Sequence, residues 1–89
     1  MKFYIKHSMT GRLRVHMDMK HMSFKQADIL EYYIKNIETV TSVKVYEKTC
    51  DAVIEFKGNK AQIINELKHF TYSQVAVPED VLNSSGREM

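Results

Sequence analysis

The sequence lacks the features that mark secreted and membrane-spanning proteins. Its single cysteine, Cys50, excludes an internal disulfide and indicates a reducing compartment. No apolar run approaches the roughly 20 residues that are needed to cross a bilayer. The opening stretch MKFYIKHS lacks the hydrophobic core of a signal peptide. We therefore expect a soluble, cytoplasmic chain that does not itself insert into a membrane.

An excess of one charge and recognisable catalytic patterns are also missing. The 13 basic and 11 acidic residues give a formal charge of +2, which argues against a dedicated nucleic-acid binder. The sequence has no pattern of Ser, His and Asp typical of hydrolases and no paired carboxylates in a shared context. We expect no enzymatic activity from this chain.

What the sequence does contain fits one small folded domain. It has 89 residues, and 44% of them are hydrophobic, a fraction typical of globular chains. We assign residues 1–78 to the domain. The stretch EDVLNSSGREM has little periodicity, so residues 79–89 are predicted to form a linker or flexible tail.

Alternating polarity predicts a first strand over residues 11–19. Apolar residues on one face alternate with polar residues on the other, namely Leu13, Val15, Met17 and Met19 against Arg12, Arg14, His16 and Asp18. Residues 3–5 would extend this strand, with Gly11 at a bulge or bend.

Two helices follow from capping signals and apolar stripes. Ser23 and Gln26 fit a capping box, and Met22 before them fits a hydrophobic staple. The first stripe is Ala27, Leu30, Ile34 and Ile37. The second helix is predicted to have Asn59 as its N-cap, with Gln62 at the third helical position. Its stripe is Ile63, Ile64, Leu67 and Phe70.

The remaining segments read as strands. VTSVKVYE and AVIEF, separated by the polar turn KTCD, predict a hairpin, and SQVAV predicts a last strand that Pro78 ends. The resulting order is βαββαβ. We predict an α+β, ferredoxin-like sandwich with a four-stranded antiparallel sheet and both helices on one face, which leaves the other face open.

From about Gly11 to Val77 the chain resembles the heavy-metal-associated domain of metallochaperones and heavy-metal-translocating P-type ATPases. ADILEYYIKNIETV resembles its first helix, SVKVYEKTCDAVIEF its hairpin and IINELKHFTY its second helix. Thr49 matches the usual threonine of the hairpin turn, and Cys50 stands where glycine is usual. HSMTGRLRV resembles a subgroup at the N-terminus of such ATPases with the pattern His-x-x-Pro-Gly-Arg-x-Arg, in which Thr10 replaces the proline.

The family's metal-binding pair is replaced in this chain. The resemblance places the two cysteines of its Cys-x-x-Cys motif at Ser23 and Gln26, where the sequence reads SFKQ. Hydroxyl and amide groups are poor ligands for the soft metals that thiolates select. These two residues are the ones that form the predicted capping box, so transfer of Cu(I) between paired thiolates is not expected.

The methionine- and histidine-rich stretch HMDMKHM offers a different ligand set. Thioether and imidazole groups bind Cu(I), and imidazole also binds Zn(II). Met17 and Met19 already have places on the inner face of the strand, which favours packing over metal binding. Any metal site would therefore use His16, His21, Met22 and Cys50.

Basic residues and one aromatic residue are predicted on the open sheet face, where Arg12, Arg14, Lys44 and Tyr46 would form a docking face. The resemblance implies the N-terminal cytosolic domain of a cation-transporting P-type ATPase of the cell membrane. Its role would be accessory or regulatory, with the other ATPase domains or a metal carrier protein as partners. Two alternatives stay open, a free-standing metal-binding, chaperone-like protein with His and Met ligands and an RNA-binding ferredoxin-like module.

Overall fold

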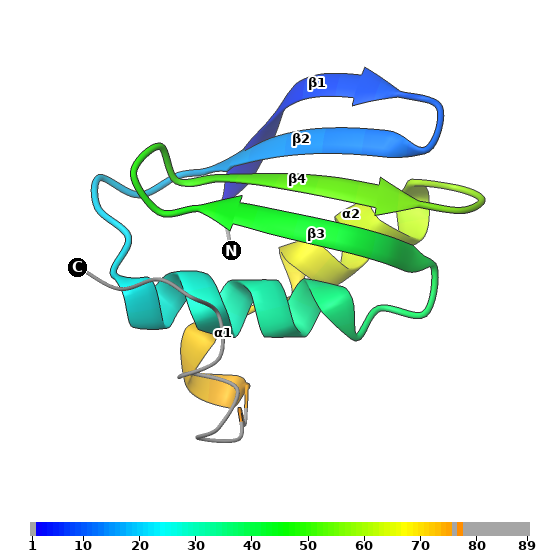
Figure 1. The fold of residues 1–89 in the computed structure, drawn as a ribbon. Helices are drawn as coiled ribbons and strands as arrows, with labels where there is room; N and C mark the ends of the chain where they lie inside the picture. Colours follow the sequence, from blue (N-terminus) through cyan, green and yellow to red (C-terminus); the bar gives the residue numbers. More distant parts are fainter. Residues whose placement is uncertain (1, 76, 78–89) are drawn as a thin grey trace.

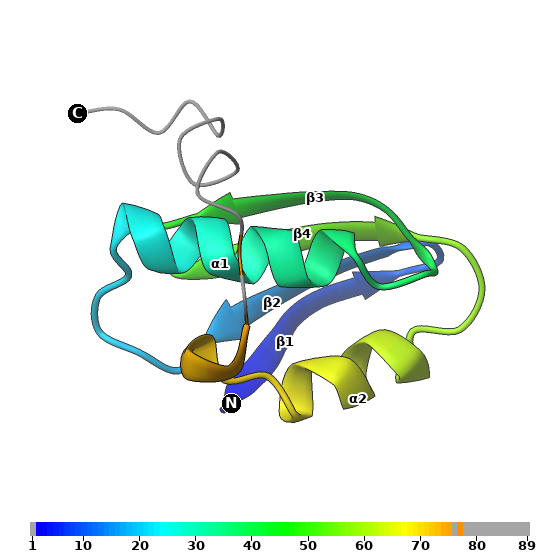
Figure 2. The ribbon, with the colours of Figure 1, turned by 90° about the horizontal axis from the view of Figure 1, so that it is seen from below.

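A computed structural model describes residues 2–75 and 77 of the chain. The elements are β1 (Phe3–Met9), β2 (Arg12–Met17), α1 (Phe24–Lys35), β3 (Val40–Tyr46), β4 (Asp51–Phe56), α2 (Ala61–Lys68) and the short 3-10 helix η1 (Tyr72–Gln74). The four strands form one antiparallel sheet in the order β1-β2-β4-β3, and both helices lie on the same side of it (Figures 1 and 2). The predicted α+β, ferredoxin-like class with a four-stranded antiparallel sheet is confirmed, whereas the predicted element order βαββαβ is wrong because the observed order is ββαββα.

The N-terminal region forms a hairpin, whereas the sequence predicted one extended strand. β1 and β2 pair antiparallel around a turn that contains Gly11. Gly11 has a φ of 77°, in the left-handed region that favours glycine, and a Cβ there would lie 3.4 Å from the Phe56 carbonyl oxygen. The predicted alternation holds within β2, where Leu13, Val15 and Met17 are fully buried. The strand ends at Met17, and Met19 packs half-buried at the edge of the core.

The fourth strand comes from the N-terminus, and the strand predicted over residues 73–77 is wrong. Tyr72–Gln74 is a 3-10 helix, and Val75 and Val77 lie outside any strand. The reason is that β1 already occupies the sheet edge beside β2. The Tyr72 ring packs instead edge-on against Phe70, with 4.7 Å between ring centroids. Pro78 and the predicted linker over residues 79–89 lie outside the described residues.

The helix starts follow their capping residues. Ser23 Oγ accepts a hydrogen bond from Gln26 N at 3.0 Å, and Gln26 Oε1 accepts one from Ser23 N at 2.9 Å, so the predicted capping box is confirmed. The second helix begins one position later than predicted. Its first residue is Ala61, whose N–H donates to Asn59 Oδ1 at 2.8 Å.

The core lies between the sheet and the two helices. It contains the inward residues of β2 and β4 and the predicted stripes of both helices, with Ile64 only partly buried. Met22 is buried there as well, at 2% exposure. Within the described part of the chain, no helix is long and apolar enough to cross a membrane.

Candidate functional site

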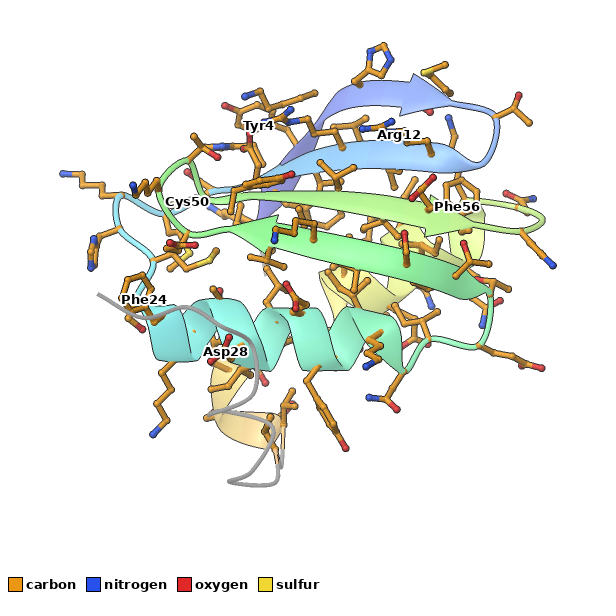
Figure 3. The ribbon with its side chains drawn as sticks, viewed as in Figure 1. Tyr4, Arg12, Phe24, Asp28, Cys50 and Phe56 are labelled. Atoms are coloured by element: carbon orange, nitrogen blue, oxygen red, sulfur yellow. The ribbon has the colours of Figure 1, made fainter. Side chains whose placement is uncertain are left out.

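The face of the sheet opposite the helices carries polar, charged and aromatic side chains, among them Tyr4 and Arg12 (Figure 3). The strand register aligns its residues in three rows across the sheet. The first row is Tyr4, His16, Asp51 and Tyr46, the second is His7, Arg14, Val53 and Lys44, and the third is Met9, Arg12, Glu55 and Ser42. We call this surface the open face, and it includes Lys6, which lies at the register shift of β1 and contacts Asp51. It brings together all four residues that the sequence assigned to a docking face, Arg12, Arg14, Lys44 and Tyr46.

Asp51 organises the open face. Its side chain is fully buried although it lies on the outer side of the sheet, because longer side chains cover it. Asp51 Oδ2 accepts hydrogen bonds from Lys6 Nζ at 3.1 Å and from Arg14 Nη2 at 2.9 Å. Asp51 Oδ1 accepts one from His16 Nδ1 at 2.7 Å. One carboxylate therefore fixes three side chains from the two neighbouring N-terminal strands.

The charge of Asp51 is retained despite its burial. Desolvation on its own raises the pKa of a buried carboxyl group, since burial penalises the charged form. The hydrogen bonds from His16, Arg14 and Lys6 outweigh this penalty and lower the pKa of Asp51 from 3.8 to about 2. Asp51 is therefore a permanent anion at neutral pH, held under a layer of cationic groups.

Apolar surface accompanies this charge. The open face exposes Tyr4 (57%), Met9 (56%) and Tyr46 (42%), which are three of the four large hydrophobic residues that the described chain exposes. The Tyr4 ring packs against the His16 ring with 5.0 Å between centroids. The guanidinium carbon of Arg14 lies 6.0 Å from the centre of the Tyr46 ring, at the outer limit of a cation–π contact. A surface of fixed cations with exposed rings at both sheet edges can bind a partner that offers acidic and apolar groups.

The four predicted metal ligands are in different environments. Met22 is buried in the core, and His16 bonds Asp51 on the open face. His21 is exposed in the loop before α1. Cys50 is 4% exposed, in the turn directly before β4. Among the described residues, no three His, Cys, Asp or Glu side chains are grouped so that they could hold a metal ion.

The Cys50 thiol also does not readily lose its proton to form a thiolate. Burial raises the pKa of its thiol, and the nearby charge of Asp51 raises it further. A metal or an oxidant reacts with the thiolate form, so both effects work against ligation. Cys50 also has a φ of 59°, a backbone conformation that glycine adopts at less cost.

The loop before α1 nevertheless faces the turn between β3 and β4. Together they line a pocket of about 390 Å³ that includes His21, Met22, Phe24, Glu47 and Lys48. The fold brings the hairpin turn and the segment that contains Ser23 side by side. Ser23, also on the wall of this pocket, uses its hydroxyl to cap the helix.

Sequence reasoning missed the residues at the centre of the open face. Asp51 was assigned to a polar turn, and Lys6 and Tyr4 were not assigned to the face. A signal for Asp51 was present, because Ala52 and Ile54 point inward and residues two apart on a strand share a face. Asp51 must then point outward with Val53 and Glu55, towards the predicted Arg14 and His16.

No protein-family model, curated protein or solved structure matches this chain. The open face and the positions of the predicted ligands are therefore the structural features that bear on function.

Proposed function

We propose that this chain is an accessory domain at the N-terminus of a cation-transporting P-type ATPase and docks through its open face on other ATPase domains or on a metal carrier protein. The observation that carries the proposal is the open face itself, because Tyr4 and Tyr46 are exposed beside cations held in place by the buried Asp51. The assignment of the parent protein as a P-type ATPase is based on the sequence resemblance alone. ATP-driven transport would belong to other parts of that protein.

The charge of the open face and the fixed positions of its side chains both suit a docking role. The open face carries four cations, Lys6, Arg12, Arg14 and Lys44, and two carboxylates, Asp51 and Glu55. The four cations outnumber the two carboxylates, so the open face has a net positive charge. Side chains that are already fixed lose less conformational entropy when a partner binds. The partner is therefore expected to present central carboxylates flanked by apolar groups.

The same geometry argues for weak metal binding. A tight site for Cu(I) or Zn(II) needs ligands that converge on one point. Here Met22 packs in the core and His16 bonds to Asp51, which leaves His21 as the exposed member of the predicted set.

The test is an NMR titration of the labelled 89-residue chain with purified soluble domains of a heavy-metal ATPase from the same genome. Amide shifts should cluster on the open face, and Tyr46→Ala should weaken binding by about tenfold, as expected for an exposed aromatic anchor. Lys25→Ala, an exposed change on α1, is the control and should have no effect. Shifts that cluster on the helices, or equal effects of both variants, would contradict the proposal.

A second candidate function is single-stranded RNA binding by the open face. The observation in its favour is the second exposed ring, Tyr4, which the sequence analysis did not include. Bases stack on exposed aromatic side chains while cations contact the phosphates. Binding of an oligouridine that weakens steeply with salt, and is lost in Tyr4→Ala and Tyr46→Ala, would favour this function over protein docking.

A further inference from the structure

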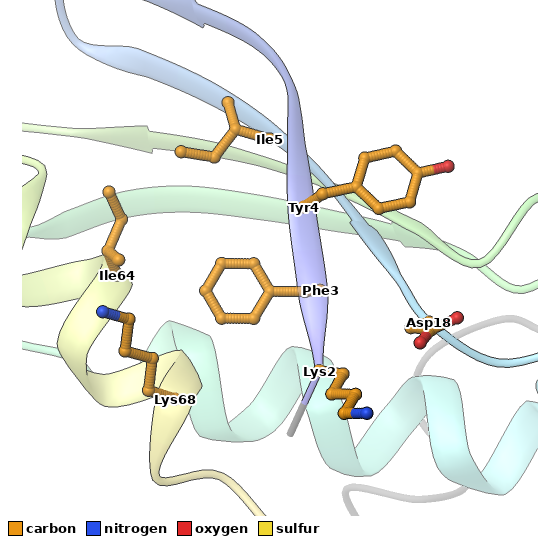
Figure 4. A pocket seen from close by; sticks show the side chains of 7 residues that line it. All are labelled: Lys2, Phe3, Tyr4, Ile5, Asp18, Ile64 and Lys68. Carbon is orange, nitrogen blue, oxygen red and sulfur yellow. The ribbon is translucent and has the colours of Figure 1, made fainter.

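A groove between β1 and α2 forms a second surface, which borders the open face at Tyr4 (Figure 4). Its volume is about 710 Å³. Phe3 and Ile5 extend from β1 towards the side where Ile64 and Lys68 of α2 lie. Ile5 is 41% exposed, although it is the inward-facing cross-strand partner of the buried Val15. The charged side chains in the lining are Lys2, Lys68 and Asp18.

The backbone beside this groove can accept another strand. β1 is an edge strand. Just before it, Lys2 O accepts a hydrogen bond at 2.9 Å from the N–H of Asp18, the residue that follows β2. Hydrogen-bonded and non-hydrogen-bonded pairs alternate along an antiparallel ladder. The N–H and C=O groups of Phe3 and Ile5 therefore point away from β2. Met17, the cross-strand partner of Phe3, accordingly directs its N–H to Cys50 O on the opposite side, at 2.8 Å.

The two sheet edges differ in how they are protected. On the β3 edge, Val45 N donates to Glu31 Oε2 of α1 at 3.0 Å. A helix side chain therefore already occupies a backbone donor that an added strand would need. On the β1 edge, the register shifts between Ile5 and His7, and Lys6 lies in the irregularity. Bulges and lysines are devices that discourage strand addition. The part of this edge that can pair is therefore Phe3 to Ile5 of β1 together with the preceding Lys2, the part that borders the groove.

We propose that the β1 edge from Lys2 to Ile5 binds an extended acidic peptide segment of a partner protein as a fifth strand. Its apolar residues at alternate positions would enter the groove and pack on Phe3, Ile5 and Ile64. Acidic residues at its ends would meet the lysines that border the groove. Lys60, Ile64 and Lys68 follow each other at four-residue steps along one side of α2, and Lys60 Nζ reaches Ser8 Oγ of β1 at 2.9 Å.

A second copy of the chain is a poorer occupant of the same edge. Antiparallel pairing of two β1 strands centred on Tyr4 would place Lys2 of each copy opposite Lys6 of the other. Like charges directly opposite each other destabilise a strand pair. Acidic termini, in contrast, bring charge opposite to that of Lys2 and Lys68, the two lysines in the lining.

The experiment titrates the full chain with the capped peptide EEVTVTVEE and, as a charge control, KKVTVTVKK. We expect amide exchange at Phe3 and Ile5 to slow by about tenfold on saturation with the acidic peptide, because these two N–H groups enter the new ladder. The lysine peptide should bind about tenfold more weakly. Ile5→Glu should weaken binding of the acidic peptide by about tenfold.

Met9→Glu is the matched variant, because Met9 lies on the same strand with 56% exposure but faces the other side of the sheet. Met9→Glu should change the affinity for the acidic peptide by less than about twofold. Tyr46→Ala should have an equally small effect, so peptide binding at the β1 edge can be told apart from docking on the open face. Circular dichroism checks the fold of each variant, and Ile5→Ala replaces Ile5→Glu if the latter unfolds. Equal effects of the two glutamate variants, equal binding of both peptides, or no binding at about 1 mM would overturn the proposal. Concentration-dependent protection of Phe3 and Ile5 without peptide would also overturn it, since a second copy would then be the occupant.

Discussion

Replacing Asp51 by asparagine tests whether the open face depends on this buried charge. Asp51→Asn keeps the shape of the side chain but removes the anion that Lys6, Arg14 and His16 contact. The pKa of Asp51 is lowered from 3.8 to about 2. A shift of one pKa unit corresponds to about 1.4 kcal/mol, so the shift is equivalent to about 2 kcal/mol of folding free energy. The side chains of Lys6 and Arg14 are about 40% exposed, so solvent screening reduces the expected loss to about 1–2 kcal/mol.

The pH dependence of this loss has a definite sign. The folded-state pKa of Asp51 lies below its ordinary value, so the stabilisation is complete above pH 3.8 and is lost as the pH falls through about 2. The asparagine side chain of the variant does not titrate. The stability difference between the wild-type chain and Asp51→Asn should therefore be constant from neutral pH to about pH 4 and should narrow below that.

Urea unfolding of both proteins, followed by circular dichroism at several pH values, measures this difference. Thermal unfolding at pH 7 should show a melting temperature about 5–15 °C lower for Asp51→Asn. Glu55→Gln is the control, because Glu55 lies on the same face of β4 and accepts a hydrogen bond from Ser42 at an exposed site. It should cost less than about 0.5 kcal/mol. Equal stability of wild type and Asp51→Asn at pH 7, or a difference that persists undiminished at the lowest pH, would refute the reasoning.

Three further predictions concern the loop before α1 and the hairpin turn. Ser23→Ala removes the acceptor for Gln26 N and should lower stability by about 1 kcal/mol in urea unfolding, while Ser23→Asp should retain most of it. The Cys50 thiol should react with a disulfide reagent at pH 7 at least about tenfold more slowly than in the urea-unfolded chain, because burial and Asp51 raise its pKa; equal rates would contradict this. Cys50→Gly should be more stable than Cys50→Ala by about 1 kcal/mol, because the φ of 59° at this position disfavours a Cβ.

The fold class could be predicted because local signals and burial agree. The capping box at Ser23 and the alternation of Leu13, Val15 and Met17 depend on neighbours in sequence, and the structure confirms both. The source of the fourth strand depends on which distant segment reaches the free edge beside β2. A short stretch such as SQVAV has the same β propensity whether or not that edge is occupied. Because β1 takes the edge, the predicted last strand has no partner there.

The candidate site was predictable only in part, for a related reason. Alternation within single strands placed Arg12, Arg14, Lys44 and Tyr46 on one face, and the register confirms that placement. The role of Asp51 depends on three strands at once, because its donors come from β1 and β2 and it lies on β4. The contribution of Tyr4 depends on the hairpin at Gly11, which the sequence analysis treated as a bend within one strand. Without that hairpin, neither Lys6 nor Tyr4 reaches the open face.

The N-terminal hairpin therefore connects the fold to both proposed interactions. By filling the edge beside β2 it supplies Lys6 to Asp51 and Tyr4 to the open face. It also makes β1 the edge strand, with Phe3 and Ile5 directed towards Ile64 of α2. Meanwhile the positions that resemble a metal-binding pair, Ser23 and Gln26, use their side chains to begin α1. A polar group that caps a helix is not free to ligate a metal. The interactions of this chain are therefore expected to depend on the charged surface of its sheet rather than on a metal ion. Because salt screens such charges, these interactions should weaken as the salt concentration rises.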